Sequence, residues 1–186
     1  MEEAARVVDV TVIVATYGSS DWRDLGAQTA EAHDAMHVHG RSLAQARNSG
    51  AEHARSQWLI FLDADDDLAP GYIDAMHAAT GDLRAPRLEL HYPDRVVTPD
   101  LTVRDIERTN PCCIGTAIRR SLFLSCGGFP HLPGWEDWAL FLRATRRGAT
   151  ITHVPGAVYR QRMRPGSRNQ TVPDAARLYA EIRAWA

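Results

Sequence analysis

The sequence predicts an α/β protein in which a Rossmann-like sheet lies between two layers of helices. Residues 7–15 are mostly β-branched and apolar, which is typical of a central strand buried on both faces. Residues 58–62 form a second short apolar run, and helical patterns separate the two runs. Strands that alternate with helices build mostly parallel sheets with both faces covered. We therefore expect a three-layer α/β/α sandwich with a mixed, mostly parallel central sheet.

The remaining elements follow from periodicity and turn residues. The clearest helix spans 136–147, because Trp138, Phe141 and Leu142 recur at helical spacing and Gly148 ends it. No repeat and no linker is visible, so a single domain is expected. The expected elements are a strand at 7–15, a helix at 24–35, a strand at 35–39, a helix at 42–55, a strand at 58–62, a helix at 71–79, strands at 87–91, 95–97 and 113–118, a helix at 136–147, a strand at 151–154, a loop or lid over 160–170, and a terminal helix at 174–185.

Composition narrows the function classes. The chain has 186 residues, of which 45% are hydrophobic and 24% charged, as in an ordinary globular domain. The net charge of −2 gives no electrostatic case for nucleic-acid binding. No apolar run is long enough for a membrane span, and the acidic start of the chain lacks a signal-peptide pattern. Three sparse cysteines fit a reducing compartment. We therefore expect a cytoplasmic protein; the oligomeric state stays open.

An acidic run at the end of the strand at 58–62 is the most informative motif. Asp63, Asp65, Asp66 and Asp67 surround Ala64, and like charges packed so closely repel. A divalent cation relieves the repulsion, because hard cations take oxygen ligands from carboxylates and phosphates together. The run therefore indicates a metal-assisted site for a phosphorylated ligand, at the strand end where open α/β sheets bind ligands. The alternative is a solvated turn in which Asp66 or Asp67 caps the following helix.

A second acidic pair opens the helix at 136–147. Glu136 and Asp137 lie at a helix N-terminus, which favours carboxylates, and the glycine- and proline-rich turn that ends at Gly134 and Trp135 precedes them. A carboxylate beneath such a turn is placed to act as a general base toward a hydroxyl. The alternative is a helix cap beside core tryptophans.

Three further features are candidates for ligand binding, each with an ordinary structural alternative. Arg47 has a guanidinium fork that suits a phosphate, or it forms a surface ion pair. Residues 159–169 include Arg160, Arg164 and two more arginines, which suits a lid that clamps a pyrophosphate or, equally, a disordered tail. His153 follows a strand and is a candidate third metal ligand, although a lone histidine is more often structural.

Several segments together resemble one family, the inverting nucleotide-sugar glycosyltransferases of family 2 with the GT-A fold. The resemblance spans roughly residues 8–160, and the order and spacing of the motifs carry it. The segments are Val10-Thr11-Val12-Ile13-Val14-Ala15-Thr16-Tyr17, Ala46-Arg47-Asn48-Ser49-Gly50, Trp58 to Asp66, Gly127-Gly128-Phe129, and Trp135-Glu136-Asp137-Trp138 with its helix.

The resemblance implies a role for each motif. Ala15, Thr16 and Tyr17 would line the nucleotide pocket, and Arg47 would face the donor. Asp63 and Asp65 match the family's Asp-x-Asp motif: Asp63 would lie near the ribose or in the metal shell, and Asp65 would ligate the Mg²⁺ or Mn²⁺ beside the diphosphate. Asp137 would be the general base and Glu136 would position the acceptor, a hydroxyl on a glycan, lipid or protein. The nucleotide-binding half would span about 7–80, the acceptor-side half about 81–160, and a lid and helix about 160–186.

The chain departs from the family at one place. An Asp-Asp-Gly-Ser type motif usually follows the second strand, and the short interval before Ala46 has none. Two other readings therefore stand beside a metal-dependent, inverting glycosyltransferase. One is a degenerate member that binds nucleotide or sugar without turnover. The other is a nucleotidyltransferase, which the absence of a glycine-rich, lysine-bearing phosphate loop disfavours.

Overall fold

The computed structural model describes residues 9–164 and 174–186. Its centre is one mixed sheet with the strand order β2-β1-β3-β7-β5-β8-β4, and β6 pairs with β5. The described elements are β1 (Val10–Tyr17), α1 (Ser20–Ala32), β2 (Met36–Gly40), α2 (Leu43–His53), β3 (Trp58–Asp63), β4 (Asp67–Leu68), α3 (Tyr72–Ala78), β5 (Leu83–His91), β6 (Val96–Val97), β7 (Ala117–Arg119), α4 (Arg120–Ser125), α5 (Glu136–Arg146), β8 (Ile151–Arg162) and α6 (Ala175–Trp185).

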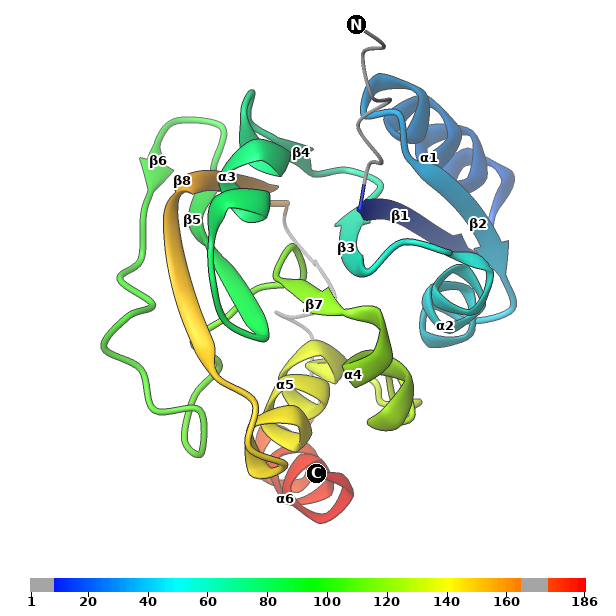
Figure 1. Ribbon diagram of the computed structural model, residues 1–186. Coiled ribbons are helices and arrows are strands. Elements are labelled where there is room, and N and C mark those ends of the chain that lie inside the picture. Colours follow the sequence, from blue (N-terminus) through cyan, green and yellow to red (C-terminus); the bar gives the residue numbers. More distant parts are fainter. Residues whose placement is uncertain (1–8, 165–173) are drawn as a thin grey trace, which may run out of the picture.

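The expected three-layer α/β/α architecture with a mixed sheet is confirmed (Figure 1). β1 pairs in parallel with β2 and β3, and β5 pairs in parallel with β8. The antiparallel pairs of β7 with β3 and β5, of β4 with β8 and of β6 with β5 are short. The long ladders of the sheet are therefore the parallel ones.

Side-chain alternation along the strands divides the core into two layers. Val12 and Ile60 pack on the face covered by α1 and α3, whereas Ile13 and Phe61 pack on the face covered by α2, α4 and α5. This is the period of two that strands impose. A third apolar cluster joins α6 to α5, so the terminal helix extends the second helical layer.

Several expected elements differ from the structure; the expected helix at 24–35 spans Ser20–Ala32, and the expected strand at 87–91 begins at Leu83. The expected strand at 113–118 is a strand only from Ala117, because the chain turns before it, with the Thr116 N–H bonded to the Cys113 carbonyl. The expected strand at 151–154 continues to Arg162, so the expected loop at 160–170 begins inside β8. Pro155 interrupts the ladder without ending it, because the register shifts there opposite Pro86 and pairing resumes at Val158.

The helix-cap alternative for the acidic run is wrong. Gly71 is the N-cap of α3, with φ of 79°, and Asp67 lies in β4. Asp66 turns its side chain into the protein, as described below. Two short elements, α4 and β4, have no counterpart among the expected ones. Residues 7 and 8 of the first expected strand lie outside the described residues.

Candidate active site

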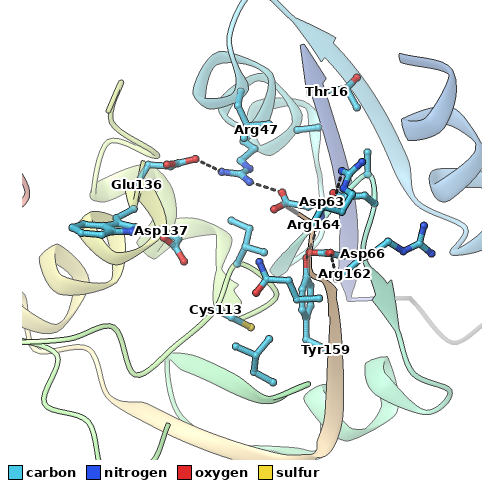
Figure 2. Close-up of a pocket in the computed structure, with 18 of the residues that line it drawn as sticks. Thr16, Arg47, Asp63, Asp66, Cys113, Glu136, Asp137, Tyr159, Arg162 and Arg164 are labelled. Atoms are coloured by element: carbon cyan, nitrogen blue, oxygen red, sulfur yellow. Dashed lines mark hydrogen bonds and ion pairs between the residues drawn. The ribbon is translucent and has the colours of Figure 1, made fainter. Parts of the chain in front are cut away.

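A cavity of about 840 Å³ opens where β1 and β3 end, between the first turn of α5 and the end of β8 (Figure 2). Its walls come from segments far apart in the sequence, and most of the residues singled out in the sequence line it. These are Ala15, Thr16, Tyr17, Arg47, Asp63, Ala64, Asp65, Trp135, Glu136, Asp137 and Arg164. The two acidic motifs, which lie far apart in the chain, therefore face one cavity.

Arg47 lies between these two acidic motifs. Its Nη1 donates to Glu136 Oε1 at 2.7 Å and its Nη2 donates to Asp63 Oδ1 at 2.5 Å (Figure 2). Arg47 lines the cavity but is only 3% exposed, so it is not the surface ion-pair residue of the alternative interpretation. Burial works to lower its pKa, but the carboxylates of Asp63 and Glu136 raise it above the ordinary value. The Arg47 guanidinium therefore joins the two walls of the cavity.

The neighbour of Arg47 anchors the turn in front of α5. Asn48 Nδ2 donates to the Phe129 carbonyl at 3.0 Å, and Asn48 Oδ1 accepts from the Phe129 N–H at 2.8 Å. Gly128 lies against this amide with φ of +72°, where a Cβ would be 2.5 Å from Asn48 Oδ1. The Arg-Asn pair of α2 thus fixes both the turn and the first residue of α5.

Asp137 is partly buried beside Glu136 in the first turn of α5. Its Oδ2 accepts a hydrogen bond from Asn110 Nδ2 at 3.1 Å. Burial, together with the Glu136 carboxylate, raises the pKa of Asp137 to about 6. A carboxylate with a pKa in this range both exists ionised at neutral pH and accepts a proton more readily than an exposed aspartate.

Trp135, which caps α5, has a left-handed backbone with φ of 54°. Non-glycine residues seldom adopt this conformation, and such strain gathers at functional sites. It turns the chain sharply before Glu136. Trp135 lines the cavity, whereas Gly134 is buried and lies outside the lining.

The carboxylates of the acidic turn after β3 lie in two different environments. Asp63 and Asp65 line the cavity with partly exposed side chains, and Asp65 forms an ion pair with Arg164. Asp66 is buried, and its two oxygens accept from the Tyr159 hydroxyl and from the Arg162 N–H. Burial, and then the carboxylates of Asp63 and Asp65, raise the pKa of Asp66 to about 8.

The donor set at this turn suits a divalent cation that is bound together with a phosphate. Asp63 and Asp65 offer the hard oxygen ligands that Mg²⁺ and Mn²⁺ prefer. Within residues 9–164 and 174–186, no three His, Cys, Asp or Glu side chains are grouped to hold a metal alone. Mg²⁺ commonly takes one or two carboxylates and completes its shell with water and substrate phosphates, so the residues present fit such a cation.

The end of β1 meets two histidines of β2. Thr16 Oγ1 lies 2.9 Å from His37 Nε2 and 3.0 Å from His39 Nδ1. Burial lowers the pKa of His37, and His39 and Arg23 add to the effect. These contacts fix the rotamer of Thr16 at the edge of the cavity.

Two predicted site residues lie away from the cavity. His153 is on β8 opposite Ala85 and has Asp100 as its charged neighbour, so the structure does not bring it to the Asp63–Asp65 turn. Arg160 is also outside the lining and pairs with Asp67 at 3.0 Å. Arg168, part of the expected lid, lies outside the described residues.

Asn110, Tyr159, Gln161 and Arg162 also line the cavity; the sequence analysis gave none of them a role of its own, although the last three lie in the expected lid segment at 159–169. Asn110 comes from a segment whose local pattern carries no chemical signal, and the arginine-rich pattern around Tyr159 does not point to the tyrosine itself. Only their contacts with the two acidic motifs identify them.

Comparisons with known proteins agree with this geometry. Residues 11–85 match the model of glycosyl transferase family 2. The match covers less than half of the chain. The stretch covers β1, the Arg47 helix and the Asp63–Asp65 turn. EpsH of Bacillus subtilis (strain 168), a protein assigned as a glycosyltransferase, is 30% identical over 78 residues, which is 40% of this chain and 23% of EpsH.

Solved structures extend the likeness to the whole fold. The S. aureus TarS 1-349 structure with UDP-GlcNAc has a TM-score of 0.66 and 16% sequence identity, over 93% of this chain and 64% of that one. The TarS 1-349 structure with UDP has a TM-score of 0.59 and 18% identity over the same shares. The chain thus shares the GT-A fold of TarS and spans under two thirds of these relatives. No helix among the described residues has the length and apolarity needed to cross a membrane.

Proposed function

We propose that this chain is a metal-dependent glycosyltransferase that moves a sugar from a nucleotide-diphosphate donor to a hydroxyl acceptor with inversion. The observation that carries the proposal is the placement of two acidic motifs across one cavity, joined by Arg47. The match to the model of glycosyl transferase family 2 over residues 11–85 and the fold shared with TarS, whose structures hold UDP and UDP-GlcNAc, support it.

On the donor side, which residues 7–80 mostly form, Ala15, Thr16 and Tyr17 would face the nucleotide. Asp63 and Asp65 would hold Mn²⁺ or Mg²⁺, which when bound supplies positive charge that stabilises the leaving diphosphate. Arg164 now neutralises Asp65 and lies over Trp22, so it is within reach of the same phosphates.

On the acceptor side, Asp137 would remove the proton from the attacking hydroxyl. Its raised pKa suits a base at neutral pH, and its place across the cavity from Asp63 suits attack on the face opposite the leaving group. A single displacement of this kind inverts the anomeric centre, as it does in inverting glycoside hydrolases. Glu136 would position the acceptor while Arg47 holds Glu136 in place.

The test is release of nucleoside diphosphate from a panel of nucleotide sugars with Mn²⁺ and candidate acceptors. Asp137→Asn should abolish turnover and keep donor binding. Asp94→Asn is the matched control, because Asp94 is exposed and has Arg95 as its ion-pair partner away from the cavity. Equal turnover in the two variants would contradict the assignment of the base. Donor binding without turnover in the unmodified chain would favour a non-catalytic binding module.

A further inference from the structure

The Tyr159 hydroxyl occupies a central position beneath the acidic turn. It accepts a hydrogen bond from the Asp63 N–H at 3.2 Å and donates one to Asp66 Oδ2 at 2.9 Å. The other oxygen of Asp66 accepts from the Arg162 N–H at 2.8 Å. We call these three linked hydrogen bonds the Tyr159 clasp; Figure 2 shows Tyr159 rising toward Asp66 and Arg162.

Through the clasp, Asp66 holds the acidic turn in place, whereas its neighbours Asp63 and Asp65 face the cavity. Both of its carboxylate oxygens accept hydrogen bonds from β8, and the residue is 8% exposed although it lies on the cavity wall. Its own N–H donates to the Asp63 carbonyl at 3.0 Å, which closes the turn from the other side. A turn held at both its backbone and its side chain leaves Asp63 and Asp65 little freedom of orientation.

The same strand leads directly to Arg164. β8 carries Tyr159 and Arg162, and two residues later Arg164 pairs with Asp65. The turn that presents Asp65 and the segment that presents its arginine partner are therefore fixed to each other through the Tyr159 clasp.

We propose that Tyr159 and Asp66 are positioning residues that set the geometry of the Asp63 and Asp65 carboxylates for a divalent cation. The proposal rests on the metal site of the proposed function. Groups that orient metal ligands from behind usually matter for affinity, because a cation as demanding of geometry as Mg²⁺ loses binding when its ligands are free to rotate.

A purely structural role for a buried tyrosine hydroxyl is the competing explanation, and the chain offers a matched control. Tyr72 is 2% exposed and Tyr159 is 1% exposed, and both lie in the same apolar cluster. The Tyr72 hydroxyl donates to the Gly115 carbonyl at 2.7 Å, and Tyr72 does not line the cavity. Each Tyr→Phe change removes one buried hydroxyl and leaves the ring in place.

The experiment measures Mn²⁺ binding by electron paramagnetic resonance of free Mn²⁺, with thermal unfolding of each protein in parallel. Tyr159→Phe should raise the Kd for Mn²⁺ by roughly tenfold or more, as loss of a supporting partner does. Tyr72→Phe should leave the Kd within about twofold, because its hydroxyl bonds to the Gly115 carbonyl and not to the acidic turn, while both variants lose thermal stability. Asp66→Asn, which weakens the clasp from its other end, should raise the Kd in the same direction and serves if Tyr159→Phe does not fold.

The outcomes separate the two proposals. Equal Mn²⁺ affinity in the unmodified chain, Tyr159→Phe and Asp66→Asn would overturn the positioning role and leave the metal site standing. An equal loss of affinity in Tyr159→Phe and Tyr72→Phe would overturn it too, since general loosening would then explain both. No Mn²⁺ binding by the unmodified chain would overturn the metal site of the proposed function and this inference with it.

Discussion

Replacing Arg47 by Met removes the guanidinium group that lies between the two acidic walls of the cavity. Met keeps an unbranched apolar side chain at this position and deletes both ion pairs, at 2.7 Å to Glu136 and 2.5 Å to Asp63. Breaking a buried ion pair by removing one partner costs about 3–5 kcal/mol, because the buried carboxylate loses its charged neighbour. The Glu136 side chain is 6% exposed and that of Asp63 is 33% exposed, so water compensates Asp63 in part and most of the loss comes from Glu136.

Urea unfolding followed by circular dichroism measures this loss. Arg177→Met is the control, because Arg177 makes an exposed pair with Glu181 within one helix, which contributes about 0.3–0.5 kcal/mol. Arg47→Lys should fall between the two, since an ammonium keeps the charge but lacks the planar fork that reaches both carboxylates. Adding Glu136→Gln to Arg47→Met should recover part of the stability, because the buried carboxylate that lost Arg47 is then replaced by a neutral amide. If Arg47→Met costs no more than Arg177→Met, the bridge between the two walls does not exist in solution.

Three further predictions follow from the site. Turnover should fall as the pH drops through about 6, because the base Asp137 is active when deprotonated and its folded pKa lies there; a flat kcat/KM profile between pH 5 and 8 would contradict this. Gly128→Ala should lower the free energy of unfolding by about 1–3 kcal/mol more than Gly148→Ala. Both glycines have positive φ, but only a Cβ at position 128 would meet the Asn48 side chain and break its hydrogen bonds. Unfolding midpoints in urea measure the difference, and equal midpoints would contradict it. Arg164→Ala should tighten Mn²⁺ binding about two- to fivefold in the resonance assay, since a competing partner of Asp65 is gone, and weaker binding would show that Arg164 helps the cation instead.

The local hydrophobic pattern of the sequence was sufficient to predict the strands of the parallel half of the sheet. β1 and β3 are apolar, β-branched or aromatic runs buried on both faces, and such runs fit few other structures. The position of Asp63 and Asp65 at the end of β3 followed from that strand alone. The pairing of Arg47 with Glu136 did not, because the two residues are 89 positions apart and only the packing of α2 against the turn before α5 brings them together.

The second half of the chain was harder to predict for identifiable reasons. The expected strand at 151–154 stops just before Pro155, which cannot donate to a ladder, yet a shift of register carries β8 past this residue to Tyr159. Residues 113–116 are apolar enough for a strand but form a turn on the cavity wall. Tyr159 and Asn110 became visible as site residues only through their contacts with Asp66 and Asp137.

Calorimetric titration of UDP, GDP and CDP into the chain, with and without Mn²⁺, tests the central claim most directly. The account predicts that one nucleoside diphosphate binds when Mn²⁺ is present and binds far more weakly without it. It also predicts that Asp65→Asn removes the difference between the two conditions, because Asp65 would then no longer ligate the cation. Binding of none of the three nucleotides, or binding that neither Mn²⁺ nor Asp65→Asn alters, would contradict a metal-assisted donor site at the end of β3.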